Sequence, residues 1–112
     1  MKTDQFTLKN LRLTIVGDEA GFVCSHTKGQ YIDVVGENIY FTGSDKFSFY
    51  MLSAVLPLIA AKQRVTQPND WMSTDDYIAC PDPNCEAKLK ITIIGKKQFN
   101  HSDTTKVTLN DD

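Results

Sequence analysis

The stretch Leu11-Arg-Leu-Thr-Ile-Val16 decides the fold, because its apolar and polar side chains alternate with a period of two residues. That period is typical of a β-strand with one buried face. Residues 87–94 repeat the pattern and end before Gly95, with Lys and Thr between three apolar residues: Leu89, Ile91 and Ile93. The sequence therefore predicts a sheet in which these two segments are the best-marked strands.

Shorter strands are predicted around these two. Turn residues separate four further segments that are compatible with strands: 22–26, 31–35, 39–41 and 77–80. The first three would follow residues 11–16 as an antiparallel meander, and the last would form a hairpin with residues 87–94.

Residues 47–64 follow a different period. Ser44 or Ser48 is a suitable N-cap, and apolar residues recur at the spacing of one helical face: Phe49, Leu52, Ala54, Val55, Leu56, Ile59 and Ala60. Pro57 either kinks this helix or begins a second one after a break at Leu56. We therefore predict an α+β domain, a small antiparallel sheet with one long helix packed on one face. In that packing Leu52, Val55, Leu56 and Ile59 would be buried against Leu13, Ile15, Leu89, Ile91 and Ile93.

The size of the chain suits one domain. It has 112 residues, of which 41% are hydrophobic, enough to close one core. We expect a single domain over residues 1–112, with an ordered core over about residues 6–97 and a polar C-terminal tail over about residues 98–112.

Charge and hydropathy exclude several classes of protein. The net charge is −2 with no long run of Lys or Arg, so nucleic acid is not an expected partner. The first twenty-five residues lack the pattern of a secretory signal, and no apolar stretch is long enough for a transmembrane helix. We therefore expect a cytoplasmic protein that does not interact with membranes. In that compartment, three cysteines do not indicate a disulfide framework.

The segment Cys80-Pro-Asp-Pro-Asn-Cys85 is the clearest motif that carries chemistry. Two prolines and an asparagine force a tight turn, and the spacing of its two thiols falls in the range of paired zinc ligands. Cys24 and His26 lie two residues apart on a predicted strand, so both would leave the same face and supply the two missing ligands. Together they predict a Cys₃His metal site made of Cys24, His26, Cys80 and Cys85.

Several alternatives to this site stay open. Cys24 and Cys80 are also explained as small buried side chains, with His26 at a surface turn. Reactive thiol chemistry is a third reading, and His101 is a second candidate for the nitrogen ligand. The sequence shows neither a phosphate-binding glycine motif nor a G-x-S-x-G elbow, and the adjacent pairs Asp75-Asp76 and Asp18-Glu19 do not indicate acid–base catalysis, so no catalytic residue is predicted.

The predicted function follows from that ligand set. Zinc suits mixed sulfur and nitrogen ligation, whereas iron, the alternative, favours a more sulfur-rich set. Four protein ligands would give a closed, structural site in a non-enzymatic or accessory domain, and three would leave an open position, as in a small metalloenzyme. The alternative without metal is an interaction module, acting through the segment around Trp71 as a homo-oligomer or as the small subunit of a larger enzyme.

A resemblance to a known family agrees with a small discrete domain. Residues 47–56, Trp71-Met72, Cys80-Pro-Asp-Pro and Lys90-Ile-Thr-Ile resemble, in order and spacing, a family of short, uncharacterised microbial proteins found largely in anaerobes and archaea. Members have a front segment with Cys and His and a C-P-D motif before the last strand. The resemblance covers about residues 11–95 and implies a role for Cys80, but it implies no reaction.

Overall fold

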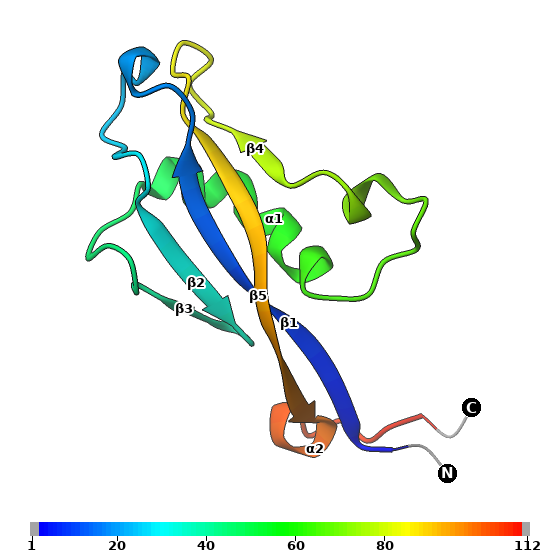
Figure 1. The fold of residues 1–112 in the computed structure, drawn as a ribbon. Coiled ribbons are helices and arrows are strands. Elements are labelled where there is room, and N and C mark those ends of the chain that lie inside the picture. The colour runs from blue at the N-terminus through cyan, green and yellow to red at the C-terminus, as the bar shows by residue number, and fades with distance from the viewer. Residues whose placement is uncertain (1–2, 111–112) are drawn as a thin grey trace.

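A twisted, five-stranded antiparallel sheet is the main body of the computed structural model, which describes residues 3–110 (Figure 1). The strand order is β3-β2-β1-β5-β4. The strands are β1 (Gln5–Val16), β2 (Tyr31–Val35), β3 (Asn38–Tyr40), β4 (Tyr77–Ala79) and β5 (Lys88–Asn100). The ends of the predicted domain and of its predicted tail, residues 1–2 and 111–112, lie outside the described residues.

The two central strands are longer than predicted. β1 and β5 pair from Gln5↔Asn100 to Val16↔Lys88. We expected Gly95 to end the second strand, but β5 continues through a register shift opposite Asn10 and Leu11, a β-bulge that absorbs one extra residue. Most residues beyond the bulge are polar, and Leu8 is the one buried residue there, so these segments show no clear strand period.

Beyond the bulge, residues 5–10 and 95–100 form a two-stranded arm. β2 pairs with β1 only at residues 11–14, and β4 pairs with β5 only at residues 88–90. The short helix α2 (His101–Thr104) closes the arm, where the backbone N–H of His101 donates to the carbonyl oxygen of Asp4 at 2.7 Å. The arm makes the molecule long and thin, with extents of 56 × 33 × 21 Å.

The predicted fold class, α+β with one long helix packed on one face of a small sheet, is wrong. Among the described residues only α1 (Phe49–Lys62) exceeds a single turn. At about 1.5 Å per residue it is roughly half as long as either central strand, which rises about 3.3 Å per residue. The backbone of α1 comes nearest to β4 and to the short turn η2 (Trp71–Ser73), at one edge of the sheet. The helix is capped by Ser48 and continues through Pro57 without the break considered at Leu56. None of the described helices is long and apolar enough to cross a membrane.

The core confirms part of the predicted packing. Leu13, Ile15, Leu89 and Ile91 are buried with Val55 and Ile59 of α1 in one hydrophobic cluster, and Leu52 packs against it. Two residues were assigned wrongly: Leu56 is 50% exposed and Ile93 is 55% exposed. Leu56 lies one position beyond Val55, so it leaves the buried stripe of the helix, which is Met51, Val55 and Ile59.

The predicted strand over residues 22–26 is also wrong. After the turn η1 (Glu19–Gly21), residues 22–30 form a loop without strand pairing. A turn ends the loop, where the N–H of Gln30 donates to the carbonyl of Thr27 at 3.1 Å, and Gly29 and Gln30 make the backbone hydrogen bonds to Ile15 of β1, at 2.9 and 2.8 Å. Cys24 and His26 therefore lie in a loop, and the regular sheet resumes at β2.

Candidate metal centre

The four residues of the predicted site lie at the end of the sheet opposite the arm. Cys24 and His26 belong to the loop between β1 and β2, Cys80 directly follows β4, and Cys85 precedes β5. Figure 1 shows these two loops side by side at that end. Antiparallel pairing of β1 and β5 places the end of one strand beside the start of the other, which is why segments distant in sequence meet here.

Backbone contacts hold the two loops together independently of the cysteines. The N–H of Glu86 donates to the carbonyl oxygen of Gly21 at 3.0 Å. Gly17, at the end of β1, has a φ of +118°, and a Cβ atom there would lie 2.6 Å from the carbonyl oxygen of Glu86. A side chain at Gly17 would push the Cys85–Glu86 segment away from β1.

The predicted turn between Cys80 and Cys85 is present. Its carboxylate Asp82 accepts from the N–H of Asn84 at 2.9 Å, and the carbonyl of Asp82 accepts from the N–H of Cys85 at 3.0 Å. At its base the N–H of Cys80 donates to the carbonyl of Ala87 at 3.2 Å. These bonds fold the turn back so that both of its cysteines face the same side.

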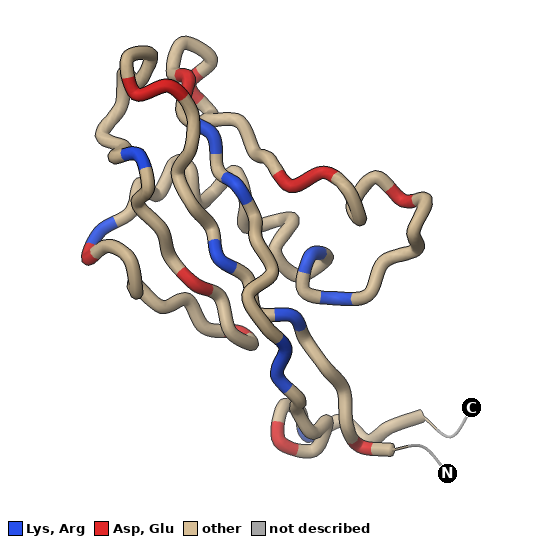
Figure 2. Tube along the Cα trace, in the orientation of Figure 1, with Lys and Arg blue, Asp and Glu red and all other residues tan. Residues whose placement is uncertain are grey.

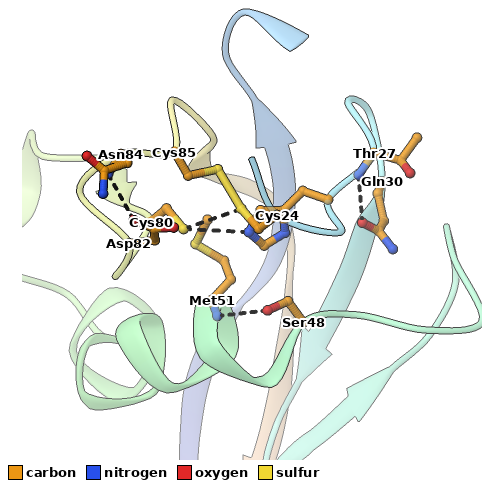
Figure 3. The surroundings of a disulfide bond; sticks show 10 residues. Cys24, Thr27, Gln30, Ser48, Met51, Cys80, Asp82, Asn84 and Cys85 are labelled. Carbon is orange, nitrogen blue, oxygen red and sulfur yellow. Dashed lines mark hydrogen bonds between the residues drawn. A yellow bond between two sulfur atoms is a disulfide. The ribbon is translucent and has the colours of Figure 1, made fainter. Parts of the chain in front are cut away.

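The side chains of Cys24, His26, Cys80 and Cys85 converge. One ligand atom from each residue lies within 4.8 Å of the other three. The Sγ atoms of Cys24 and Cys80 are 3.8 Å apart, and Cys80 Sγ is 3.7 Å from His26 Nε2 (Figure 3). The structure thus brings the four predicted ligands together, even though the strand expected to carry two of them is a loop.

Cys24 and Cys85 also form a disulfide, which the sequence analysis did not predict. Their Cα atoms are 6.6 Å apart, inside the range that disulfides span. The two residues are 61 positions apart in the chain, and no local pattern marks such a pair. Cys80 is free and buried. The same three sulfurs therefore have two chemistries open to them, metal ligation as thiolates or pairing of two of them as a disulfide.

His26 is suited to metal binding by its protonation state. The imidazole is buried, with 8% of the residue exposed, and this burial lowers its pKa below the ordinary value of 6.5. The neutral form that a metal requires is therefore dominant at neutral pH. Nδ1 is buried without a hydrogen-bond partner among the described residues, and the ring of Phe22 lies edge-on to the imidazole, with centroids 6.5 Å apart.

The second candidate for the nitrogen ligand lies elsewhere. His101 begins α2 at the end of the arm, and its Nε2 is 2.7 Å from the carbonyl oxygen of Val107. Figure 1 shows α2 at the opposite end of the sheet from the cysteine loops. Of the two histidines in the chain, His26 is the one placed among the cysteines.

The charge around the loops favours a cation. Asp18 caps the start of η1, Glu19 is its first residue, and Glu86 packs against Gly21 of the same turn. Figure 2 shows both acidic and basic residues at this end of the sheet. In residues 17–30 and 80–87 the four acidic residues, Asp18, Glu19, Asp82 and Glu86, outnumber the one basic residue, Lys28. A field of this sign raises the local concentration of positive ions.

The residues define a compact cluster of thiols and imidazole of the kind that binds zinc or forms disulfides. No family model matches the chain, and no curated protein and no solved structure shows significant similarity to it.

Proposed function

We propose that the protein is a small zinc-binding domain whose metal centre is structural. The ligands in this proposal are the thiolates of Cys24, Cys80 and Cys85 and one ring nitrogen of His26. The observation that carries the proposal is the convergence of four ligand atoms within 4.8 Å of one another.

The separations within the cluster suit a zinc tetrahedron. Zinc–sulfur bonds of about 2.3 Å and zinc–nitrogen bonds of about 2.0–2.1 Å give tetrahedral edges of about 3.8 Å between sulfurs and about 3.6 Å between sulfur and nitrogen. The corresponding separations are 3.8 Å for Cys24 and Cys80 and 3.7 Å for Cys80 and His26. Opening the Cys24–Cys85 disulfide by reduction would let that edge lengthen to the same value.

The identity of the ion follows from the ligand set. Three sulfurs and one nitrogen are a common structural zinc set, and iron in a cluster would favour a fourth sulfur. With four protein ligands the site has no open position, so the proposed role is to join the two loops and not to activate water. The binding free energy would then contribute to folding.

A second candidate function is a metal-free interaction module, and two observations favour it. The disulfide takes two of the four proposed ligands, and large aromatic side chains are exposed outside the core, with Trp71 at 60%. Such a module would act as a homo-oligomer or as the small subunit of a larger enzyme. It predicts no bound metal and a molecular mass that exceeds one chain.

Elemental analysis separates the two candidates. Untagged protein should be purified under reducing conditions, and the zinc proposal predicts about one zinc ion per chain and, after exchange, the Co²⁺ absorption of a tetrahedral thiolate site. His26→Ala should weaken zinc binding by more than about 100-fold, because losing a residue that binds the ion directly costs more than losing one that only hydrogen-bonds to a ligand. The matched control His101→Ala should bind as the wild type does. A reduced wild-type protein without metal would support the interaction module.

A further inference from the structure

Two of the proposed zinc ligands are joined to each other in the structure. Cys24 and Cys85 form the disulfide, while Cys80 stays a free thiol 3.8 Å from the sulfur of Cys24. A sulfur in a disulfide carries no thiolate charge and is not a zinc ligand. The disulfide and the zinc site are therefore mutually exclusive states of one cluster.

We propose that Cys24 and Cys85 are a thiol oxidation site through which a hydroperoxide releases the metal. This inference rests on the proposed zinc site and adds its regulation. The oxidant is identified by chemical class only, as a small peroxide able to reach a partly exposed sulfur.

Exposure decides which sulfur reacts first. Cys24 is partly exposed and lies in the loop of residues 22–30, whereas Cys80 and Cys85 are both buried. Oxidation by peroxide requires both thiolate character and access. Cys24 is thus the point of attack, and the neighbouring sulfurs are placed to trap the product.

The chemistry balances with one peroxide and two protons. The Cys24 thiolate attacks one peroxide oxygen, so an S–O bond forms, the O–O bond breaks, and the leaving hydroxide takes a proton to become water. The Cys85 thiolate then attacks the Cys24 sulfur, so the S–S bond forms, the S–O bond breaks, and a second protonated hydroxide leaves as water. The two thiolates lose two electrons and the peroxide gains them. Only His26 and Cys80 then remain as ligands, so the zinc ion would be released.

The pairing of Cys24 with Cys85 is favoured by the way the loops are held. The hydrogen bond from Glu86 to Gly21 and the close approach of Gly17 to Glu86 fix the Cys85 segment against the end of β1. Cys80 instead lies beside His26 Nε2, at 3.7 Å. The two loops are joined in either state, by zinc or by the disulfide. Oxidation should therefore replace one cross-link by the other without unfolding the domain.

The test treats reduced, zinc-loaded wild-type protein with hydrogen peroxide. Zinc is first measured by elemental analysis, and its release is then followed with a metallochromic dye. Free thiols are titrated in denaturant, and disulfides are located by peptide mapping under non-reducing conditions.

We expect zinc release together with a fall from three thiols to one, because the chain has three cysteines and the disulfide uses two. The remaining thiol should map to Cys80, and a dithiol reductant with added zinc should restore the starting state.

The possible failures are distinguishable. Zinc absent before peroxide is added would remove both the proposed function and this inference. Three outcomes would overturn this inference and leave the proposed function intact. Zinc could stay bound after oxidation, the new disulfide could include Cys80, or the cysteines could become sulfinic acids without forming a disulfide. Metal-free Cys80→Ala is the matched variant: it retains the pair and should pass from two thiols to none with the same cross-linked peptides. Failure of this variant to form that cross-link would also overturn the inference.

Discussion

At one end of the sheet, β1 and β5 continue alone as a two-stranded arm, and at the other end the loops that leave them meet around three cysteines and a histidine. The arm has regular backbone pairing from Gln5↔Asn100 to Asn10↔Gly95. Leu8 is its one buried residue, and the ring of Phe6 stacks on that of Phe99 with centroids 5.6 Å apart. The loop end has almost no regular pairing, yet Cys80, Cys85 and His26 are all buried there.

This difference shows that regular secondary structure and resistance to unfolding need not coincide. A two-stranded ribbon is only marginally stable in water, because it orders backbone without burying much apolar surface. Loops joined by a disulfide lose less freedom on folding, because the covalent bond already restricts the unfolded chain. A metal instead adds its binding free energy to the folded state. We therefore expect the loop end to open with the whole domain and the arm to open locally.

The largest effect is expected from removing the cross-link. In oxidised protein, Cys85→Ala should lower the free energy of unfolding by about 4 kcal/mol, the loop-closure entropy of a disulfide between residues 61 positions apart. Cys80→Ala removes the same side-chain volume but keeps the disulfide, so its cost should stay within about 2 kcal/mol. In reduced, zinc-loaded protein both variants should lose stability to a similar degree. Denaturant titrations in both redox states measure this, and equal costs for the two variants in oxidised protein would contradict the assignment of the cross-link.

The next effect concerns the helix beneath the cysteine loops. Met51 is fully buried in the core cluster that includes Cys80 and Cys85, and Figure 3 shows it beside the cysteines. Met51→Ala should cost about 2–5 kcal/mol. Leu56→Ala, at a half-exposed position of the same helix, should cost less than about 1 kcal/mol. Chemical denaturation of the pair tests the orientation of α1, and a larger loss for Leu56→Ala would mean that the helix presents another face to the core.

A third effect lies in the middle of the sheet, between the two ends. Asp33 accepts hydrogen bonds from Arg12 Nε at 2.9 Å, from Arg12 Nη2 at 3.1 Å and from Thr42 Oγ1 at 2.7 Å. The hydrogen bonds from Arg12 lower the pKa of Asp33 below its ordinary value of 3.8, although desolvation opposes the shift. Stability from this group is present above the ordinary pKa and is lost as the pH falls through the lowered one.

Asp33→Asn tests that contribution. The variant should lose about 1–3 kcal/mol near pH 7, because Arg12 then has a neutral partner. The difference from wild type should shrink as the pH falls below about 4, where the Asp33 carboxylate of the unfolded chain becomes protonated, and it should vanish once the pH has passed the lowered pKa of the folded state. Urea titrations across this range supply the measurement, and a difference that does not change with pH would show that the charge of Asp33 contributes nothing.

The smallest effect is expected in the arm. Phe6 and Phe99 should show a coupling of about 0.5–1.5 kcal/mol in a double-mutant cycle with alanine. Amide hydrogen exchange should be faster at residues 5–10 than at residues 11–16 of the same strand, because the first segment has one buried residue, Leu8, and the second has three. Uniform protection along β1 would show that the arm and the loop end unfold together, which contradicts local opening of the arm.

Local pattern predicted the parts of the fold that bury one face. The alternation in residues 11–16 and 87–94 indicated the central strands, and the helical spacing found α1. The same reasoning failed where little of a face is buried: most residues of the arm are polar, and they become strands because each segment supplies the hydrogen-bond partners of the other, 85 to 95 positions away in the chain. The same spacing also predicted too wide a buried face for the helix, since Leu56 fits the apolar spacing but is half exposed.

The candidate site was predicted for a partly wrong reason. Cys24 and His26 were expected to share a strand face, but they are brought together by a loop, and the antiparallel pairing of β1 with β5 places that loop beside the Cys80–Cys85 turn. The ligand residues could be named because cysteine and histidine are few in the chain. The disulfide could not be predicted, because a pair 61 residues apart depends on tertiary structure.

X-ray absorption at the zinc edge of reduced, untagged protein tests the central claim most directly. We expect the zinc ion to be bound by three sulfurs at about 2.3 Å and one nitrogen at about 2.0–2.1 Å, and the nitrogen contribution should disappear in His26→Ala but not in His101→Ala. A zinc ion surrounded only by nitrogen and oxygen, or a shell with fewer than three sulfurs, would contradict the Cys24, His26, Cys80 and Cys85 centre.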